Sequence, residues 1–265
     1  MNIVKIPALK DNYIWILYNK GKGLVIDPGD ASPVFYILDK LHLTLIGILL
    51  THYHTDHVGG IDRLKKAFPD IPVYGSYETR HTGATRIVQD GNIIRIMDHS
   101  FKVMHLPGHT LGHIGFFCDK EKWLFCGDTL FTAGCGKILE GTPQTMYNSI
   151  IKINSLPLDT LICSSHEYTL QNLKFARTLL PEDNILLSFE KKVKKILNHS
   201  KILPTTKLFL ERKINVFLRC NDIEIYKKIG INYTNIIQPI HIFTHLRKMK
   251  DTFVIFLFTY SIFIF

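Results

Sequence analysis

The sequence predicts a layered α/β domain followed by a smaller helical region, and three observations favour this division. Short apolar runs alternate with turn residues and helical stretches through the first part of the chain. Several of these runs end at histidine or aspartate, as strands do where an α/β protein places its site. After Tyr168 the apolar residues follow helical spacing. We therefore expect residues 1–168 to form the first domain and residues 169–253 the second.

The first domain is expected to hold short strands separated by turns and helices. One helix is predicted to begin with Ser32 as N-cap and Pro33 as its first residue, because proline is favoured there, and to end at Leu41. Residues 61–68 show helical spacing and end before a proline. The expected strands are apolar runs bounded by turn residues: residues 3–6, 13–18, 24–26, 46–50, 73–74, 93–97, 101–106, 123–126 and 161–163.

The second region is expected to contain amphipathic helices at residues 171–180 and 189–199. The latter carries a lysine run, which we interpret as a solvated helix face and not as a nucleic-acid patch: Lys191, Lys192, Lys194 and Lys195. Residues 254–265 form an almost wholly apolar tail, shorter than the about 20 residues that a membrane-spanning helix needs. We assign this tail no role.

The composition is that of a folded protein with an excess of positive charge. The 265 residues are 46% hydrophobic, which supports a well-buried core and excludes a disordered chain. The net charge of +9 fits a nucleic acid, a membrane surface or a small anionic substrate. The N-terminus lacks a basic region followed by a long apolar run, so we expect a cytoplasmic protein. The cysteines form no Cys-x-x-Cys pair and are expected to be reduced core thiols: Cys118, Cys126, Cys135, Cys163 and Cys220.

The stretch of residues 51–57 is the strongest functional signal in the chain. It places four metal-capable side chains within six residues, directly after an apolar run. Alternate residues of an extended segment face the same way, so His52 and His54 point to one side, and the chain then turns for Asp56 and His57. The two pairs can serve two neighbouring metal ions. The alternative is a polar loop in which Asp56, or the threonine before it, caps the next helix.

Later strand ends carry further metal-capable side chains. His109 follows Gly108, which permits a tight turn close to an ion, so it is favoured over His113 as a ligand. We interpret His113 as a core histidine or as a residue that orients a ligand. Asp128 follows an apolar strand and can bridge two ions through its two oxygens; the alternative is a turn or N-cap aspartate. His166 follows the last strand.

These strand ends together favour a dinuclear metal site. One strand that ends in a metal-capable residue is common, but four that converge on the same edge of one sheet make two metal ions the simplest interpretation. Asp27, at an earlier strand end, is either an ordinary turn residue or a residue that orients the histidine stretch. Histidine and aspartate ligands suit zinc, iron and manganese, and we expect zinc.

The same residues resemble a known superfamily. It is the metallo-β-lactamase superfamily, whose αββα sandwich holds one or two metal ions, and its motifs are matched by residues 51–57, 108–110, 127–129 and His166. Within it, the chain is similar to the glyoxalase II (hydroxyacylglutathione hydrolase) family through residues 10–15, 134–137, 140–142 and 166–169. The match extends to about Phe253, and it implies a catalytic sandwich domain followed by a helical substrate-binding domain.

The resemblance also implies a ligand set and a substrate site. One metal is implied to be held by His52, His54 and His109. The other is implied to be held by Asp56, His57 and His166. Asp128 is implied to bridge the two ions. Contacts to glutathione are implied for Lys137, Tyr168, Arg247 and Lys250.

The implied reaction is the hydrolysis of a small-molecule thioester. S-D-lactoylglutathione and water would give D-lactate and glutathione, in methylglyoxal detoxification. Two cations make a bridging hydroxide available near neutral pH and polarise the thioester carbonyl. The thiolate leaving group needs little acid assistance. We expect a monomer that binds no nucleic acid and has no membrane span.

Three residues depart from the family pattern, and they leave alternatives open. Ser165 stands where the family has glycine before its last histidine ligand, Leu139 replaces an aromatic residue that contacts substrate, and Val216 replaces a proline. If Ser165 spoils the second metal site, the chain is a non-catalytic binding protein. An iron-dependent persulfide dioxygenase resembles a shorter chain, and a flavodiiron oxidoreductase carries glutamate in place of His54. A metallo-nuclease would use the positive charge, but no aromatic-basic motif is present.

Overall fold

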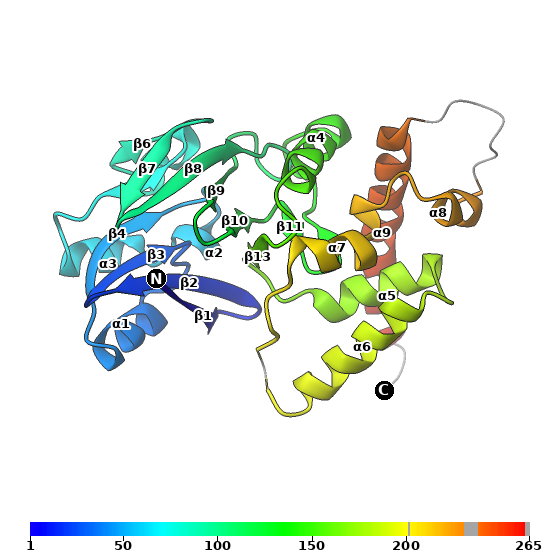
Figure 1. Cartoon of the computed structure of the whole chain (residues 1–265), viewed down its shortest axis with the longest axis horizontal. Helices are drawn as coiled ribbons and strands as arrows, with labels where there is room; N and C mark the ends of the chain where they lie inside the picture. The colour runs from blue at the N-terminus through cyan, green and yellow to red at the C-terminus, as the bar shows by residue number, and fades with distance from the viewer. Residues whose placement is uncertain (201, 231–237, 263–265) are drawn as a thin grey trace.

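Two β-sheets lie face to face in the first part of the chain (Figure 1). The computed structural model describes residues 1–200, 202–230 and 238–262. Among these residues the larger sheet has six strands, in the order β1 (Asn2–Ala8), β2 (Asn12–Asn19), β3 (Lys22–Ile26), β4 (Thr44–Leu49), β5 (Val73–Gly75) and β6 (Arg86–Ile87). The smaller sheet has the order β13 (Leu161–Ser164), β10 (Trp123–Gly127), β9 (Ile114–Cys118), β8 (His99–His105) and β7 (Ile93–Ile96). A separate hairpin joins β11 (Leu130–Phe131) to β12 (Gly134–Cys135).

Alternating side chains on these strands build three apolar layers. On β2, Ile14 and Ile16 belong to the layer under helices α1 (Ala31–Lys40) and α3 (Ile61–Ala67). Trp15, between them, points to the other side and packs in the layer between the two sheets.

The second sheet repeats this alternation. Phe125 of β10 lies between the sheets, whereas its neighbours Leu124 and Cys126 pack on the outer side with helix α4 (Pro143–Asn154). The layers therefore run helix, sheet, sheet, helix. This is the αββα sandwich that we expected.

The remaining helices pack on the outer side of the second sheet, at the end of the molecule opposite α1 and α3 (Figure 1). One apolar cluster includes Leu124 of that sheet, Ile150 of α4 and Phe243 near the C-terminus, so the sandwich and the helical region share a continuous core. The helices are α5 (Thr169–Leu179), α6 (Asn184–Leu197), α7 (Leu208–Ile214), α8 (Ile223–Lys228) and α9 (Pro239–Ile262).

Helix starts follow side-chain caps, and one predicted cap is wrong. Asp30, not Ser32, is the N-cap of α1, because its carboxylate accepts a hydrogen bond from the backbone N–H of Ser32. The same arrangement starts α6, where Asp183 accepts from the backbone N–H groups of Ile185 and Leu186.

Other expectations are confirmed or extended by the described residues. All five cysteines are buried and free. The four lysines of α6 are exposed, as a solvated face requires. Helix α9 continues to Ile262, so residues 254–262 of the apolar tail are helical, and residues 263–265 lie outside the described residues.

A buried carboxylate links the helical region to the sandwich. Glu211 of α7 accepts hydrogen bonds from the backbone N–H of Ala133 at 2.9 Å, the hydroxyl of Thr206 at 2.6 Å and the side-chain amide of Asn215 at 3.2 Å. Burial disfavours its charge more than these donors stabilise it, so its pKa is raised to about 7. Ala133 lies in the β11–β12 turn with φ of 57°, and Glu211 holds that turn.

We expect Glu211 to make stability depend on pH. Its folded-state pKa of about 7 exceeds the ordinary 4.5, so the folded protein favours the protonated form of Glu211. The stability that this form contributes is fully present below about pH 4.5 and is lost as pH rises through 7. The free energy of unfolding should fall by roughly 3 kcal/mol across this window. Glu211→Gln, which cannot ionise, should flatten the slope in denaturant titrations. The exposed Glu182→Gln is the control, and an unchanged slope in Glu211→Gln would contradict the prediction.

Candidate metal centre

The predicted ligands lie where strands of both sheets end. β8, β10 and β13 run in the same direction and lead into His109, Asp128 and His166. β4 belongs to the other sheet and leads into residues 51–57. We expected all the ligands at the edge of one sheet, and this expectation is wrong. The ligands come from the edges of two sheets, which meet because both sheets pack on a common apolar layer.

His52, His54 and His109 form the first group of facing nitrogens. Nδ1 of His54 lies 3.0 Å from Nε2 of His52 and 3.0 Å from Nε2 of His109. Three imidazole nitrogens that lie this close together can bind one cation between them.

Asp56, His57 and His166 form the second group. Oδ2 of Asp56 lies 3.5 Å from Nε2 of His57 and 3.3 Å from Nε2 of His166. Asp56 and His57 belong to the short helix α2 (Thr55–Val58), whose N-cap is His54 and which has no side-chain cap. The alternative interpretation of Asp56 as an N-cap residue is therefore wrong.

Asp128 lies between the two groups. Its Oδ2 is 3.3 Å from Nε2 of His109, and its Oδ1 is 3.4 Å from Nε2 of both His57 and His166. One carboxylate oxygen thus faces each group, the arrangement that a bridging ligand needs. All seven predicted ligand side chains come together in this cluster.

The turn before Asp128 is fixed by close packing. Gly127 has φ of 48°, and a Cβ there would lie 2.4 Å from Oγ1 of Thr51 and 2.6 Å from Nε2 of His113. The backbone N–H of Asp128 donates to Nε2 of His113 at 3.1 Å, and the His113 ring stacks on that of His52. His113 thus lies outside the ligand groups and orients their members, as one of its two interpretations predicted.

Asp27 orients the histidine stretch. Its Oδ2 lies 3.0 Å from Nδ1 of His57, and it accepts hydrogen bonds from the backbone N–H and hydroxyl of Thr51 at 2.8 and 2.7 Å. The Thr51 hydroxyl in turn lies 3.0 Å from Nδ1 of His52. Of the two interpretations of Asp27, these contacts favour the orienting role. Such partners fix the ring that faces the metal.

Sequence reasoning missed two residues that orient the ligands of the second group. Asp11 Oδ1 lies 2.8 Å from Nδ1 of His166, and the side-chain amide of Asn12 donates to Oδ2 of Asp56 at 2.8 Å. Both belong to a stretch that carries the family resemblance, but their partners lie far away in the sequence, so spacing gave no signal. In the first group, Nδ1 of His109 bonds the backbone carbonyl of Lys137 at 2.8 Å.

The cluster contains buried polar atoms that a cation would satisfy. Among the described residues, Nε2 of His57 and Oδ1 of Asp128 are buried without a hydrogen-bond partner. Burial and the nearby His57 and His113 hold the pKa of His52 well below its usual range, so its lone pair is available. Burial also opposes charge on His166, but Asp128 and neighbouring carboxylates outweigh it and raise its pKa to about 11. The carboxylates that stabilise positive charge on His166 would stabilise a divalent cation in the same place. The donor set therefore attracts and fits such a cation.

Ser165 is compatible with this geometry. It is buried and does not belong to the described non-glycine residues with positive φ, so the serine carries no left-handed backbone strain. Its carbonyl accepts a hydrogen bond from the backbone N–H of Tyr13 at 2.6 Å. Leu139, in contrast, is 53% exposed and offers no hydroxyl for a substrate contact.

A pocket of about 440 Å³ lies beside the second group and contains all four predicted substrate contacts: Lys137, Tyr168, Arg247 and Lys250. Asp11 and Phe131 also line it, and both contact His166. Sequence reasoning missed Lys10, another cation of its wall.

Two of these cations are buried in the pocket wall. Arg247 donates to the backbone carbonyl of Cys135 at 3.0 Å and pairs with Asp251 at 2.9 Å. Lys250 donates to the backbone carbonyl of Gln171 at 3.0 Å, and burial together with the positive charge of Arg247 lowers its pKa to about 8.

Two family models match consecutive parts of the chain. The metallo-beta-lactamase superfamily matches residues 9–166, and the hydroxyacylglutathione hydrolase C-terminus matches residues 167–253. A hydroxyacylglutathione hydrolase of Yersinia pseudotuberculosis serotype O:1b is 50% identical over 260 residues, which cover 96% of this chain and 100% of that relative. The chain belongs to the hydroxyacylglutathione hydrolase family. A relative of the same name from Pectobacterium atrosepticum is 49% identical over 255 residues, with the same coverage.

Solved structures share the fold. The B3 metallo-beta-lactamase BLEG-1 is 27% identical, with a TM-score of 0.64 over 82% of this chain and 99% of that one. TTHA1623 in a di-iron-bound form is 25% identical, with a TM-score of 0.59 over 82% of this chain and 100% of that one. ETHE1 from Myxococcus xanthus has a TM-score of 0.63 over 95% of this chain and 99% of that one, and at 19% identity it shows the fold alone.

The family and the donor clusters together support binding of a divalent metal. In the described part of the chain, no helix combines the length and apolar character needed to cross a membrane.

We expect Asp27→Asn to weaken metal binding without unfolding the protein. The amide keeps the volume but loses the charge that orients His57, and loss of such an outer partner costs about 10- to 100-fold in metal affinity. Competition with a chromophoric chelator measures this affinity. The exposed Asp62→Asn is the matched control. Equal affinities in the two variants would show that Asp27 is only a turn residue.

Proposed function

We propose that this chain hydrolyses S-2-hydroxyacylglutathione, S-D-lactoylglutathione in particular, and so acts in methylglyoxal detoxification. The observation that carries the proposal is a cation-lined pocket whose wall contacts His166, a member of the cluster of seven metal-capable side chains, through Asp11, Phe131 and Tyr168. The names of the full-length relatives support the same substrate class. Water adds to the thioester carbonyl, the C–S bond breaks, and D-lactate and glutathione leave.

The metal ligands are proposed to divide into the two groups described above. His52, His54 and His109 would hold one ion, and Asp56, His57 and His166 the other. Asp128 would bridge them through its two oxygens. Two divalent ions, which we propose to be zinc, supply Lewis acidity for the carbonyl and lower the pKa of bound water.

The chain's own residues position the substrate. The Tyr168 ring stacks on His166 with a centroid distance of 5.0 Å, and Phe131 packs on both rings, so the pocket wall continues into the metal cluster. Lys137 has two roles, because its carbonyl orients His109 while its side chain lines the pocket. The thioester bond is thereby directed to the metal groups, and glutathione to the helices.

The pocket charges match glutathione, which carries two carboxylates. Lys137 is exposed at the pocket, while Arg247 and Lys250 present buried positive charge from α9. Charge of one sign in a partly closed site attracts the opposite charge. Leu139 takes no polar part in this contact.

We further propose that residues 1–168 form the catalytic domain and residues 169–253 the substrate-binding domain. The enzyme is proposed to act as a cytoplasmic monomer that binds no nucleic acid.

We expect Asp128→Ala to abolish thioesterase activity while the fold is retained. The bridge links both ligand groups, so turnover of S-D-lactoylglutathione should fall by about a thousandfold, as when one stabilising group is lost from a reaction site. Loss of thioester absorbance measures turnover, circular dichroism measures folding, and elemental analysis counts metal. Close to two zinc ions per parent chain are expected. Unchanged turnover in the variant would refute the assignment, and parent protein that holds one iron and consumes oxygen with glutathione persulfide would be a dioxygenase.

Lys250→Met should raise KM for the thioester roughly tenfold and leave kcat nearly unchanged, because one charged contact to glutathione is lost. Since the pKa of Lys250 is about 8, the parent KM should rise as pH increases above 8, and the variant should lack this rise.

Lys248→Met is the matched control for this prediction. It removes the same charge from an exposed position of the same helix and should leave KM unchanged. If both variants behave alike, Lys250 does not contact the substrate.

A further inference from the structure

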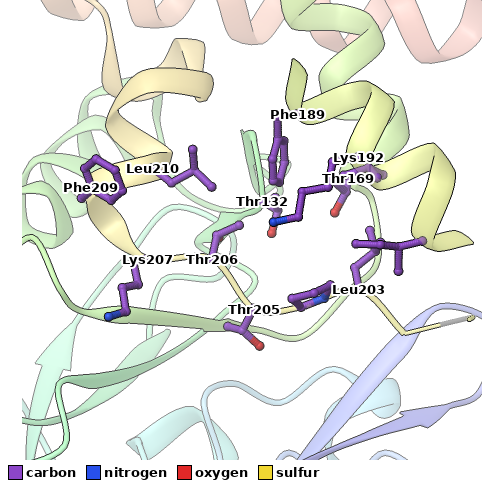
Figure 2. Close-up of a pocket in the computed structure, with 13 residues that line it drawn as sticks. Thr132, Thr169, Phe189, Lys192, Leu203, Thr205, Thr206, Lys207, Phe209 and Leu210 are labelled. Carbon is purple, nitrogen blue, oxygen red and sulfur yellow. The ribbon is translucent and has the colours of Figure 1, made fainter. Parts of the chain in front are cut away.

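A second cavity, of about 220 Å³, lies between α6 and α7 (Figure 2). It contains none of the residues assigned to metal or glutathione. Its wall is mostly apolar, and the side chains responsible are Phe189, Val193, Ile196, Leu203 and Leu210.

Two lysines bring positive charge to this cavity. Figure 2 shows Lys192 extending from α6 toward the cavity, while Lys207 lies at one side on the segment before α7; both lysines are exposed. Thr132 and Thr169 add hydroxyl groups to the inner wall. The cavity therefore combines an apolar wall with one polar, cationic end.

The nearby carboxylates are engaged elsewhere. Glu190 of α6 pairs with Arg177 at 2.9 Å and with Lys194 at 2.5 Å. Glu211 accepts its hydrogen bonds from Ala133, Thr206 and Asn215. Within residues 1–200, 202–230 and 238–262, no carboxylate forms an ion pair with Lys192 or Lys207.

We propose that this cavity binds a small amphipathic anion, an unbranched aliphatic carboxylate of about eight carbons. A cavity of 220 Å³ holds about seven groups of roughly 30 Å³ each, the size of a water molecule or a methylene. The chain lies among the apolar side chains of α6 and α7. The carboxylate accepts hydrogen bonds from the Lys192 ammonium and the threonine hydroxyls.

An anion explains the cavity better than a neutral ligand does. Lys192 is exposed, so a neutral aliphatic molecule would gain only the apolar contacts, whereas a carboxylate would also gain the attraction of the ammonium. A cationic ligand would be repelled by both lysines. The site is independent of the thioesterase, so its test needs no turnover.

The experiment measures binding of sodium octanoate to the full chain by titration calorimetry and by methyl NMR. Saturable 1:1 binding is expected, with shifts at Val193, Leu203 and Leu210. Affinity should rise about fourfold for each methylene from butanoate to octanoate, as burial of apolar surface predicts, and then level off when the cavity is full. Octan-1-ol and octylammonium should bind at least about tenfold more weakly.

Matched variants test the charged end and the apolar wall separately. Lys192→Met should weaken octanoate binding roughly tenfold. Lys191→Met removes the same charge from an exposed neighbouring position of α6 that does not line the cavity, and it should bind like the parent. Ile196→Trp should fill the cavity and abolish binding of octanoate and octanol alike, with folding checked by circular dichroism.

Several outcomes would overturn the proposal. If octanol binds as tightly as octanoate, the charge has no role in binding. If the two lysine variants weaken octanoate binding equally, the anion is attracted by the positive surface in general and not by Lys192. Shifts confined to α9 would place the anion in the glutathione pocket instead. Absence of saturable binding would show that the cavity takes no such ligand.

Discussion

The buried carboxylate of Asp128 between two groups of imidazoles is the constraint on which the rest of the structure depends. One of its oxygens faces His109, and the other faces His57 and His166. A buried carboxylate oxygen without a hydrogen-bond partner is unfavourable unless a cation compensates it. The polar ends of four strands, drawn from both sheets, therefore form a site that favours a cation, and the apolar layer between the sheets holds these ends together.

Few of the described residues join the pocket to the metal cluster. Lys137 orients His109 through its carbonyl and lines the pocket with its side chain, and Tyr168 stacks on His166 from the pocket side. A substitution of Tyr168 would therefore affect both the pocket wall and the packing on His166, whereas a substitution of Lys137 would leave its backbone carbonyl in place. The helical region also contacts the sandwich directly, because Arg247 donates a hydrogen bond to the carbonyl of Cys135 in the β11–β12 hairpin.

Local patterns predicted much of the fold and all seven members of the metal cluster. Strand alternation is visible in residues such as Ile14, Trp15 and Ile16, and closely spaced ligands in residues 51–57. The orienting contacts were not visible, because Asp11 and His166 are brought together only by the packing of β2 near β13. The assignment of ligands to one sheet edge failed for the same reason: sequence shows where a strand ends, but not which sheet it joins.

The linings of the two pockets meet at two pairs of neighbouring residues. Phe131 and Tyr168 line the pocket beside His166, whereas the next residues, Thr132 and Thr169, line the apolar cavity. Asn172 fixes the wall by donating to the carbonyl of Thr132 at 3.0 Å. None of the seven predicted metal ligands lines either pocket in the described part of the chain, so the two pockets adjoin through neighbouring residues of the chain and not through the metal cluster.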